Sequence, residues 1–236
     1  MSDEPSIIDK ITEMNVRRHL ARVLNVNPDS VVKDAKRIGM DISKPSDFGR
    51  HPTKYIYIER LSEKYAKMAA RLCAASGFTS GIGGVATTIG LAGVDLVNMA
   101  ARLYWLNQKL ALIHGFDPES DLDNQRAYMI FMVALGIDQV TQATIRTIVT
   151  KAATANLRRR GPSSVPVIRI IMQIAKGLGV RITQVQAGKL VPVVGGLVGG
   201  GVNYWFAKSV AKQMLADYKS DYFDRWQLQA RAGESG

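Results

Sequence analysis

The sequence has few of the residues from which active sites and metal centres are usually built. Its 236 residues include one cysteine, Cys73, and three histidines, His19, His51 and His114, that lie far apart in the chain. A single cysteine cannot form an internal disulfide, and no CxxC or Cys/His cluster is present to bind zinc. A set of the Ser/His/Asp or Cys/His type is not recognisable, and no motif calls for a cofactor. The sequence therefore favours a non-catalytic protein of a reducing compartment such as the cytoplasm.

Motifs for nucleotides, calcium and export are also missing. Neither GxGxxG nor GxxxxGK[ST] opens a helix after a strand, so no nucleotide site is predicted. An acidic run over residues 117–123 lacks the glycine and the closing glutamate of a calcium loop, and we expect it to cap the next helix. Residues 1–10 contain four charged side chains where a secretory signal would be apolar. No export signal is predicted.

No stretch shows the sustained apolar/polar alternation of a half-buried strand, whereas helical spacing is common. The sequence predicts an all-α, multi-helix bundle. Expected helices cover residues 6–24, a short segment from 28, and 54–76, 91–114, 122–136, 139–160, 165–178 and 203–229. Two prolines and a glycine in 44–52 break this pattern. We therefore predict an N-terminal helical extension and linker over 1–53, a helical domain over 54–229 and a flexible tail over 230–236.

Long apolar runs are few, and each can be explained by burial in a soluble core. Residues 127–137 are apolar on every side but are too short to cross a bilayer core of about 30 Å, so a central buried helix is expected. Residues 72–94 and 190–207 are free of charge and rich in glycine, with Gly195/Gly199 and Gly196/Gly200 at a spacing of four. Small residues at that spacing allow close helix packing. The two segments are either close-packed parts of a soluble core or a helical hairpin that enters a bilayer or lines an apolar cavity.

Acidic residues are absent over 139–216, although the chain as a whole contains 20 of them against 31 Lys and Arg. Eleven basic residues fall in that stretch, and we expect it to contact a membrane or another polyanion. The five residues singled out for this contact are Arg158, Arg159, Arg160, Arg169 and Lys176. The alternative is a solvated face that is balanced by acids elsewhere in the fold.

Two segments resemble the core signature of the EcsC family. The first runs from Gly77 through GFTSGIGG to Asp95 and on to the HGFD sequence at 114–117. The second is KLVPVVGG at 189–196 with Asn203 after it. The resemblance covers residues 54–226 and departs from the family pattern near Asp95, where glycines and an alanine stand in place of prolines. It implies association with a membrane and no particular reaction, and it points to Asp95 and Lys189 as important polar positions.

A polar face is predicted on the helix over 91–114. Asp95, Asn98 and Arg102 are spaced by three and four residues, so their side chains project from one side of an otherwise apolar helix. We expect Asp95 to pair with Arg102 or Lys189 and to fix the helix packing. The functional alternative is the polar floor of an apolar cavity, which would bind a headgroup or carboxylate through Asp95, Asn98, Arg102, Lys189 and Asn203.

Three functions remain after these exclusions. The favoured one is a peripheral protein at the inner face of the membrane that binds anionic lipid or an apolar ligand, with a membrane protein as a further partner. A soluble scaffold for an acidic protein or a nucleic-acid backbone is the second, but residues 139–203 contain no aromatic side chain on which bases could stack. An enzyme acting on a lipid or peptide is the third, and Asp95, Arg102 and Lys189 would have to serve it.

Overall fold

The structure is a computed structural model that describes residues 26–80, 85–136 and 195–234, with a few positions between 171 and 178. Within these ranges the backbone alone is described for residues 76–80, 85–95, 195–200 and 230–234, and the side chains are described elsewhere. The described residues form helices and turns and contain no strand, which confirms the all-α prediction. The elements are α2 (Pro28–Arg37), two short 3-10 helices, η1 (Pro45–Arg50) and η2 (Pro52–Lys54), then α3 (Tyr55–Ser80), α4 (Val85–Ile113), α5 (Asp121–Leu135) and α8 (Gly195–Glu234).

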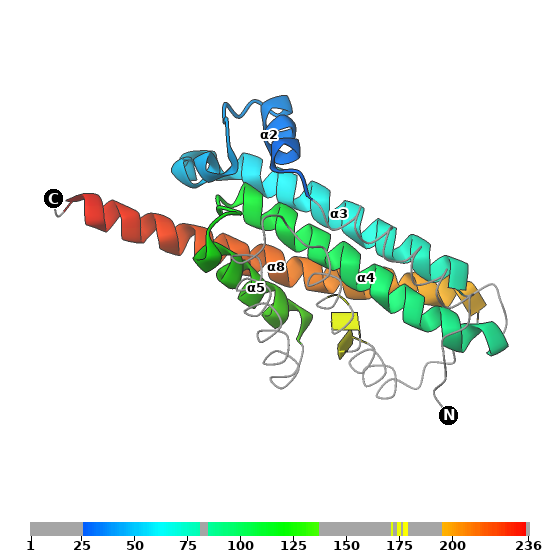
Figure 1. The fold of residues 1–236 in the computed structure, drawn as a ribbon. Helices are drawn as coiled ribbons and strands as arrows, with labels where there is room; N and C mark the ends of the chain where they lie inside the picture. Colours follow the sequence, from blue (N-terminus) through cyan, green and yellow to red (C-terminus); the bar gives the residue numbers. More distant parts are fainter. Residues whose placement is uncertain are drawn as a thin grey trace, which may run out of the picture.

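Three long helices lie side by side and form the body of the bundle (Figure 1). α3 packs against both α4 and α8, while α2 covers the side of α3 near its start and α5 packs on α8 and α4. α8 begins at the end of the bundle where α3 ends and α4 starts. Its C-terminal turns project beyond the opposite end of the bundle.

Local signals in the sequence determine where the shorter helices begin and end. Asn27 caps α2, because its Oδ1 accepts a hydrogen bond from the Asp29 amide at 2.8 Å, and Pro28 occupies the first helical position. Ser120 caps α5 in the same way through the Asp123 amide. Gly136 ends α5 in the left-handed conformation, where glycine has no steric penalty. Two acids of the predicted capping run, Asp121 and Asp123, lie in the first turn of α5, although the N-cap itself is Ser120. Asp123 also accepts from the Asp117 amide at 2.8 Å.

The glycine-rich segments are helical over more of their length than expected. α4 starts at Val85 instead of 91, α8 starts at Gly195 instead of 203, and α3 continues through Gly77 to Ser80. Glycine lowers helix propensity by only about 1 kcal/mol per residue, and each residue added to an existing helix gains a hydrogen bond. The predicted helices over 6–24 and 139–160 lie outside the described residues. α8 continues past the predicted end at 229.

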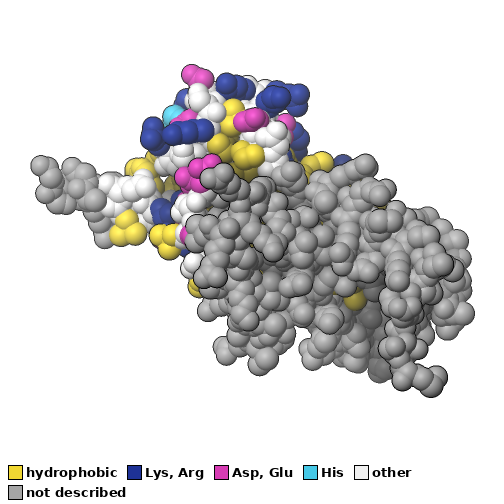
Figure 2. All heavy atoms as spheres, viewed as in Figure 1, with side chains coloured by type: hydrophobic (Ala, Val, Ile, Leu, Met, Phe, Trp, Pro, Cys, Tyr) yellow, Lys and Arg dark blue, Asp and Glu magenta, His cyan; other side chains and the backbone are white. Residues whose placement is uncertain are grey.

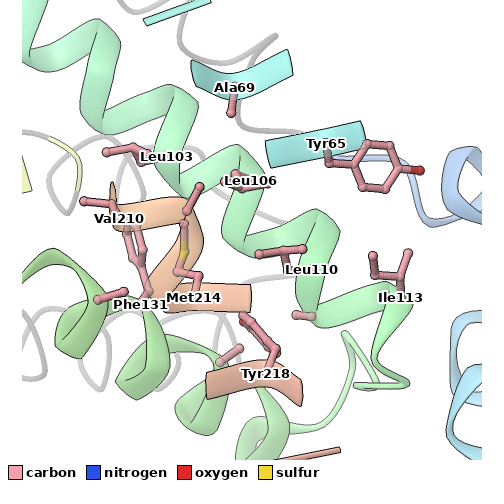
Figure 3. Close-up of a cluster of buried hydrophobic side chains, with 14 of the residues drawn as sticks. Tyr65, Ala69, Leu103, Leu106, Leu110, Ile113, Phe131, Val210, Met214 and Tyr218 are labelled. Carbon is pink, nitrogen blue, oxygen red and sulfur yellow. The ribbon is translucent and has the colours of Figure 1, made fainter. Parts of the chain in front are cut away.

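The core lies between α3, α4, α5 and α8 (Figure 3). Buried side chains of three helices point toward one another there: Leu103, Leu106, Leu110, Phe131, Val210 and Met214. Residues 28–50 contribute to the same core, since Val31, Met40, Ile42 and Phe48 are all buried within it. The division of the chain at residue 53 stays a prediction.

α5 is not the wholly buried helix that its composition suggested. Phe131 and Leu135 are fully buried, but Met129 is 52% exposed and Val133 is 59% exposed. The prediction of a central buried helix is therefore wrong for this face. Uniform apolarity removes the periodic signal from which a buried side is recognised. Among the described elements, α5 packs mainly against α8 and α4.

Candidate functional site

The predicted polar site is only partly visible among the described side chains. Asn98 and Arg102 lie half-buried on α4, and Asn203 lies half-buried on α8. The side chain of Asp95 and all of Lys189 are outside the described residues, so their pairing stays a prediction. Burial raises the pKa of the Cys73 thiol to about 12, although the positive charge of Arg102 opposes this shift. Cys73 therefore stays protonated and is a poor nucleophile at neutral pH.

The basic contact residues predicted at 158–160, 169 and 176 also lie outside the described residues. The acid-free stretch is described at its C-terminal end, where α8 carries the exposed cations Lys208 and Lys212. Trp205 and Tyr204 precede them and are 59% and 37% exposed. The Lys208 ammonium lies 5.9 Å from the centre of the Tyr204 ring.

These residues share one side of α8. Gly201, Trp205, Lys208 and Lys212 are spaced by four, three and four residues, which places them in one row along the helix. All four are exposed, and a Cβ added to Gly201 would meet no atom within 4 Å. We call this row, together with Tyr204, the α8 face. It combines aromatic rings and ammonium groups in the N-terminal half of α8.

A buried polar cluster lies toward the other end of α8, around the fully buried His114. The His114 Nδ1–H donates to the Leu110 carbonyl at 2.7 Å, so Nε2 is the acceptor and the Tyr55 hydroxyl donates to it at 3.1 Å. Tyr218 packs against the imidazole with ring centres 5.2 Å apart. The imidazole thus caps a carbonyl of the last turn of α4. No pattern in the sequence indicates which aromatic side chains surround it.

The His114 imidazole is neutral, and the charged side chains near it are paired with one another. Burial lowers the pKa of His114 to about 4, the hydrogen bond to Leu110 opposes the shift, and the nearby Arg225 guanidinium adds to it. Arg225 donates to the His114 carbonyl at 2.8 Å and to Asp221 at 2.7 Å. Asp221 also accepts from Arg126 of α5 at 2.7 Å. The cluster thus joins α3, α4, α5 and α8 through satisfied hydrogen bonds, which argues for a structural role.

The model of the EcsC protein family matches residues 49–219. The chain belongs to the EcsC protein family. No curated protein and no solved structure matches it. The matched region includes η2, α3, α4, α5, the His114 turn and the α8 face, whereas α2 and most of η1 precede it and the C-terminal part of α8 follows it. None of the helices in the described part of this EcsC-family chain is long and apolar enough to cross a membrane.

In this EcsC-family chain α2 is attached to the matched region by a second polar cluster. Asp34 accepts from the Tyr65 hydroxyl at 2.7 Å and lies 3.3 Å from the Lys64 ammonium. Burial would raise the pKa of Asp34, but these two hydrogen bonds outweigh it and the pKa is lowered. The buried Lys109 donates to Ser30 of α2, with its ammonium 5.1 Å from the Tyr65 ring centre. Burial lowers the pKa of Lys109. We assign this cluster to the docking of α2.

Tyr55→Phe tests the structural role of the His114 cluster in the EcsC-family fold. The substitution leaves His114 Nε2 buried without its donor, which should cost about 1–2 kcal/mol of unfolding free energy. Tyr57→Phe is the matched control, since Tyr57 is only half-buried and its hydroxyl makes no hydrogen bond with the described residues. Urea unfolding followed by circular dichroism measures both. Equal stability of the two variants would show that the Tyr55 hydrogen bond contributes little.

Proposed function

We propose that this EcsC-family protein docks peripherally on anionic membrane surfaces. The observation that supports this most directly is the acid-free stretch over 139–216, with eleven Lys and Arg and no Asp or Glu. Its described part places Lys208 and Lys212 on an exposed side of α8. A basic side chain near an anionic bilayer contributes about 1 kcal/mol to binding, and this contribution falls off within a Debye length.

Other exposed regions of the molecule fit an anionic surface less well. The face formed by α2 and the start of α3 carries many Lys and Arg, but Asp and Glu are interspersed among them (Figure 2). Asp34 there lies within 3.4 Å of Arg37 and of Lys64, and Glu59 lies 2.9 Å from Lys219. Neighbouring charges of opposite sign cancel at a distance, so this face attracts anions weakly.

Co-sedimentation with vesicles tests the proposal. The protein should pellet with vesicles of mixed neutral and anionic phospholipid at low salt, and much less at high salt or with purely neutral vesicles. The double substitution Lys208→Gln, Lys212→Gln should weaken binding by about 2 kcal/mol, or roughly thirtyfold. The matched control is Lys33→Gln, Lys36→Gln, which removes two exposed charges from α2 and should change binding little.

Vesicle pelleting, together with a parallel measurement of binding to single-stranded nucleic acid, distinguishes the alternatives. Negligible pelleting with both vesicle types would contradict membrane docking. Binding to single-stranded nucleic acid with no binding to vesicles would favour the polyanion alternative instead. Equal loss of vesicle binding in the two double variants would show that net charge matters and that the position on α8 does not.

A further inference from the structure

We infer that Trp205 and Tyr204 enter the headgroup region of an anionic bilayer and that the molecule docks with the N-terminal half of α8 against it. This inference rests on the proposed function, to which it adds the contacting residues and the orientation. The bilayer is chosen as the partner because Trp205 and the cations of the α8 face lie in one exposed row, with the Tyr204 ring beside it. Indole and phenol rings favour the membrane–water interface, where an apolar body and a polar tip are both satisfied.

The geometry of the α8 face fits such an interface. Trp205 is 59% exposed, whereas tryptophan side chains are highly buried on average in folded proteins. Lys208 and Lys212 follow it by one and two turns on the same side. Their aliphatic stems can lie along the apolar layer while the ammonium groups reach lipid phosphates. The first carboxylate further along α8 is Asp217, which is half-buried and accepts a hydrogen bond from Gln213 at 2.9 Å.

A second exposed tryptophan on the same helix provides an internal comparison. Trp226 is 40% exposed near the projecting end of α8. Two acids, Asp221 and Asp224, precede it within two turns. Asp221 is paired with Arg126 and Arg225, so the charges near this tryptophan largely cancel and attract an anionic surface weakly. Of the two tryptophans, Trp205 is the one followed by cations of a single sign that pair with no acid among the described residues, which is the charge context of an anionic-membrane anchor. At a rise of 1.5 Å per residue, the two positions are about 30 Å apart along the helix, which lets an experiment separate them.

Tryptophan fluorescence with brominated lipids measures which end is in contact. The chain has three tryptophans, so Trp105→Phe with Trp226→Phe retains Trp205, and Trp105→Phe with Trp205→Phe retains Trp226. With anionic vesicles, Trp205 should shift to shorter wavelength and be quenched by lipids brominated on the acyl chain, while Trp226 should do neither. Trp105 is half-buried, with the Lys109 ammonium 5.8 Å from its ring centre. The single variants Trp226→Phe and Trp205→Phe, which retain Trp105, are therefore also made as a control for its removal.

Binding strength gives a second readout. Trp205→Ala should weaken vesicle binding roughly tenfold, the factor expected if about 55 Å² of indole surface leaves water on docking. Trp226→Ala is the matched control and should leave binding unchanged. Melting temperatures of all variants show whether each remains folded.

Failure of the inference is distinguishable from failure of the proposed function. Vesicle binding with no shift or quenching of Trp205 would overturn the anchor and leave electrostatic docking intact. Equal quenching of Trp205 and Trp226 would overturn the orientation, because α8 would then lie flat along its length. Absence of vesicle binding in the parent protein would overturn both.

Discussion

Gly115→Ala should destabilise the protein by about 3 kcal/mol or more, because two separate conditions require glycine at this position. Its φ is +82°, a conformation that residues with a Cβ rarely adopt. A Cβ built on Gly115 would also lie 2.8 Å from the Gly49 amide nitrogen and 3.0 Å from its Cα. Those are backbone atoms of η1, so relief would require the segment to move. Urea unfolding followed by circular dichroism gives the loss directly.

Substitutions at two other glycines separate the cost of the left-handed backbone from the cost of the steric contact. Gly39 has φ +88° but no atom within 4 Å of an added Cβ, so Gly39→Ala should cost only about 1 kcal/mol for the backbone conformation. Gly49 faces open space in the same test and has no left-handed φ, so Gly49→Ala should have little effect. An equal loss of unfolding free energy in Gly115→Ala and Gly39→Ala would show that η1 moves away from the end of α4 at little energetic cost.

The sequence predicted those parts of the fold that depend on neighbouring residues. The short helix expected from 28 begins at Pro28, and the acidic run over 117–123 indicated the start of α5. The starts of α4 and α8 were placed too far along the chain and the end of α3 too early, because weak local propensity was given more weight than continuation of a long packed helix. The exposed side of α5 was missed because its sequence has no polar side to identify it.

For the two candidate sites, too, the sequence predicts what depends on spacing within one helix and not what depends on contacts between helices. The row of Trp205, Lys208 and Lys212 is visible as helical spacing, but the same tryptophan in an apolar segment is equally compatible with a buried position until its exposure is known. The His114 cluster joins residues from α3, α4 and α8 that are far apart in the chain. Helical spacing places Tyr218 and Tyr222 on one side of a helix, but it does not indicate which histidine they will meet.

Acidification should destabilise the protein by about 3 kcal/mol between pH 6.5 and pH 4, mainly through His114. In the unfolded chain a histidine has its ordinary pKa near 6.5, whereas burial lowers the pKa of the folded His114 to about 4. The unfolded state therefore binds more protons within this window. The stability is fully present above pH 6.5 and is lost as the pH falls toward 4. Asp34 and Asp47, whose pKa values are lowered in the fold, contribute mainly below that range.

The measurement is the free energy of unfolding in urea at several pH values for the parent and for His114→Gln. Glutamine can still donate to the Leu110 carbonyl and accept from Tyr55, and it does not titrate. Its variant should be less stable at neutral pH but should lose most of the slope between pH 6.5 and 4. His51→Gln removes a half-buried imidazole from the turn before η2 and serves as the matched control. Burial raises the pKa values of Tyr55, Tyr218 and Tyr222, which surround His114 together with the Arg225 guanidinium, far above this window. An unchanged slope in His114→Gln would therefore assign the acid sensitivity to another part of the chain.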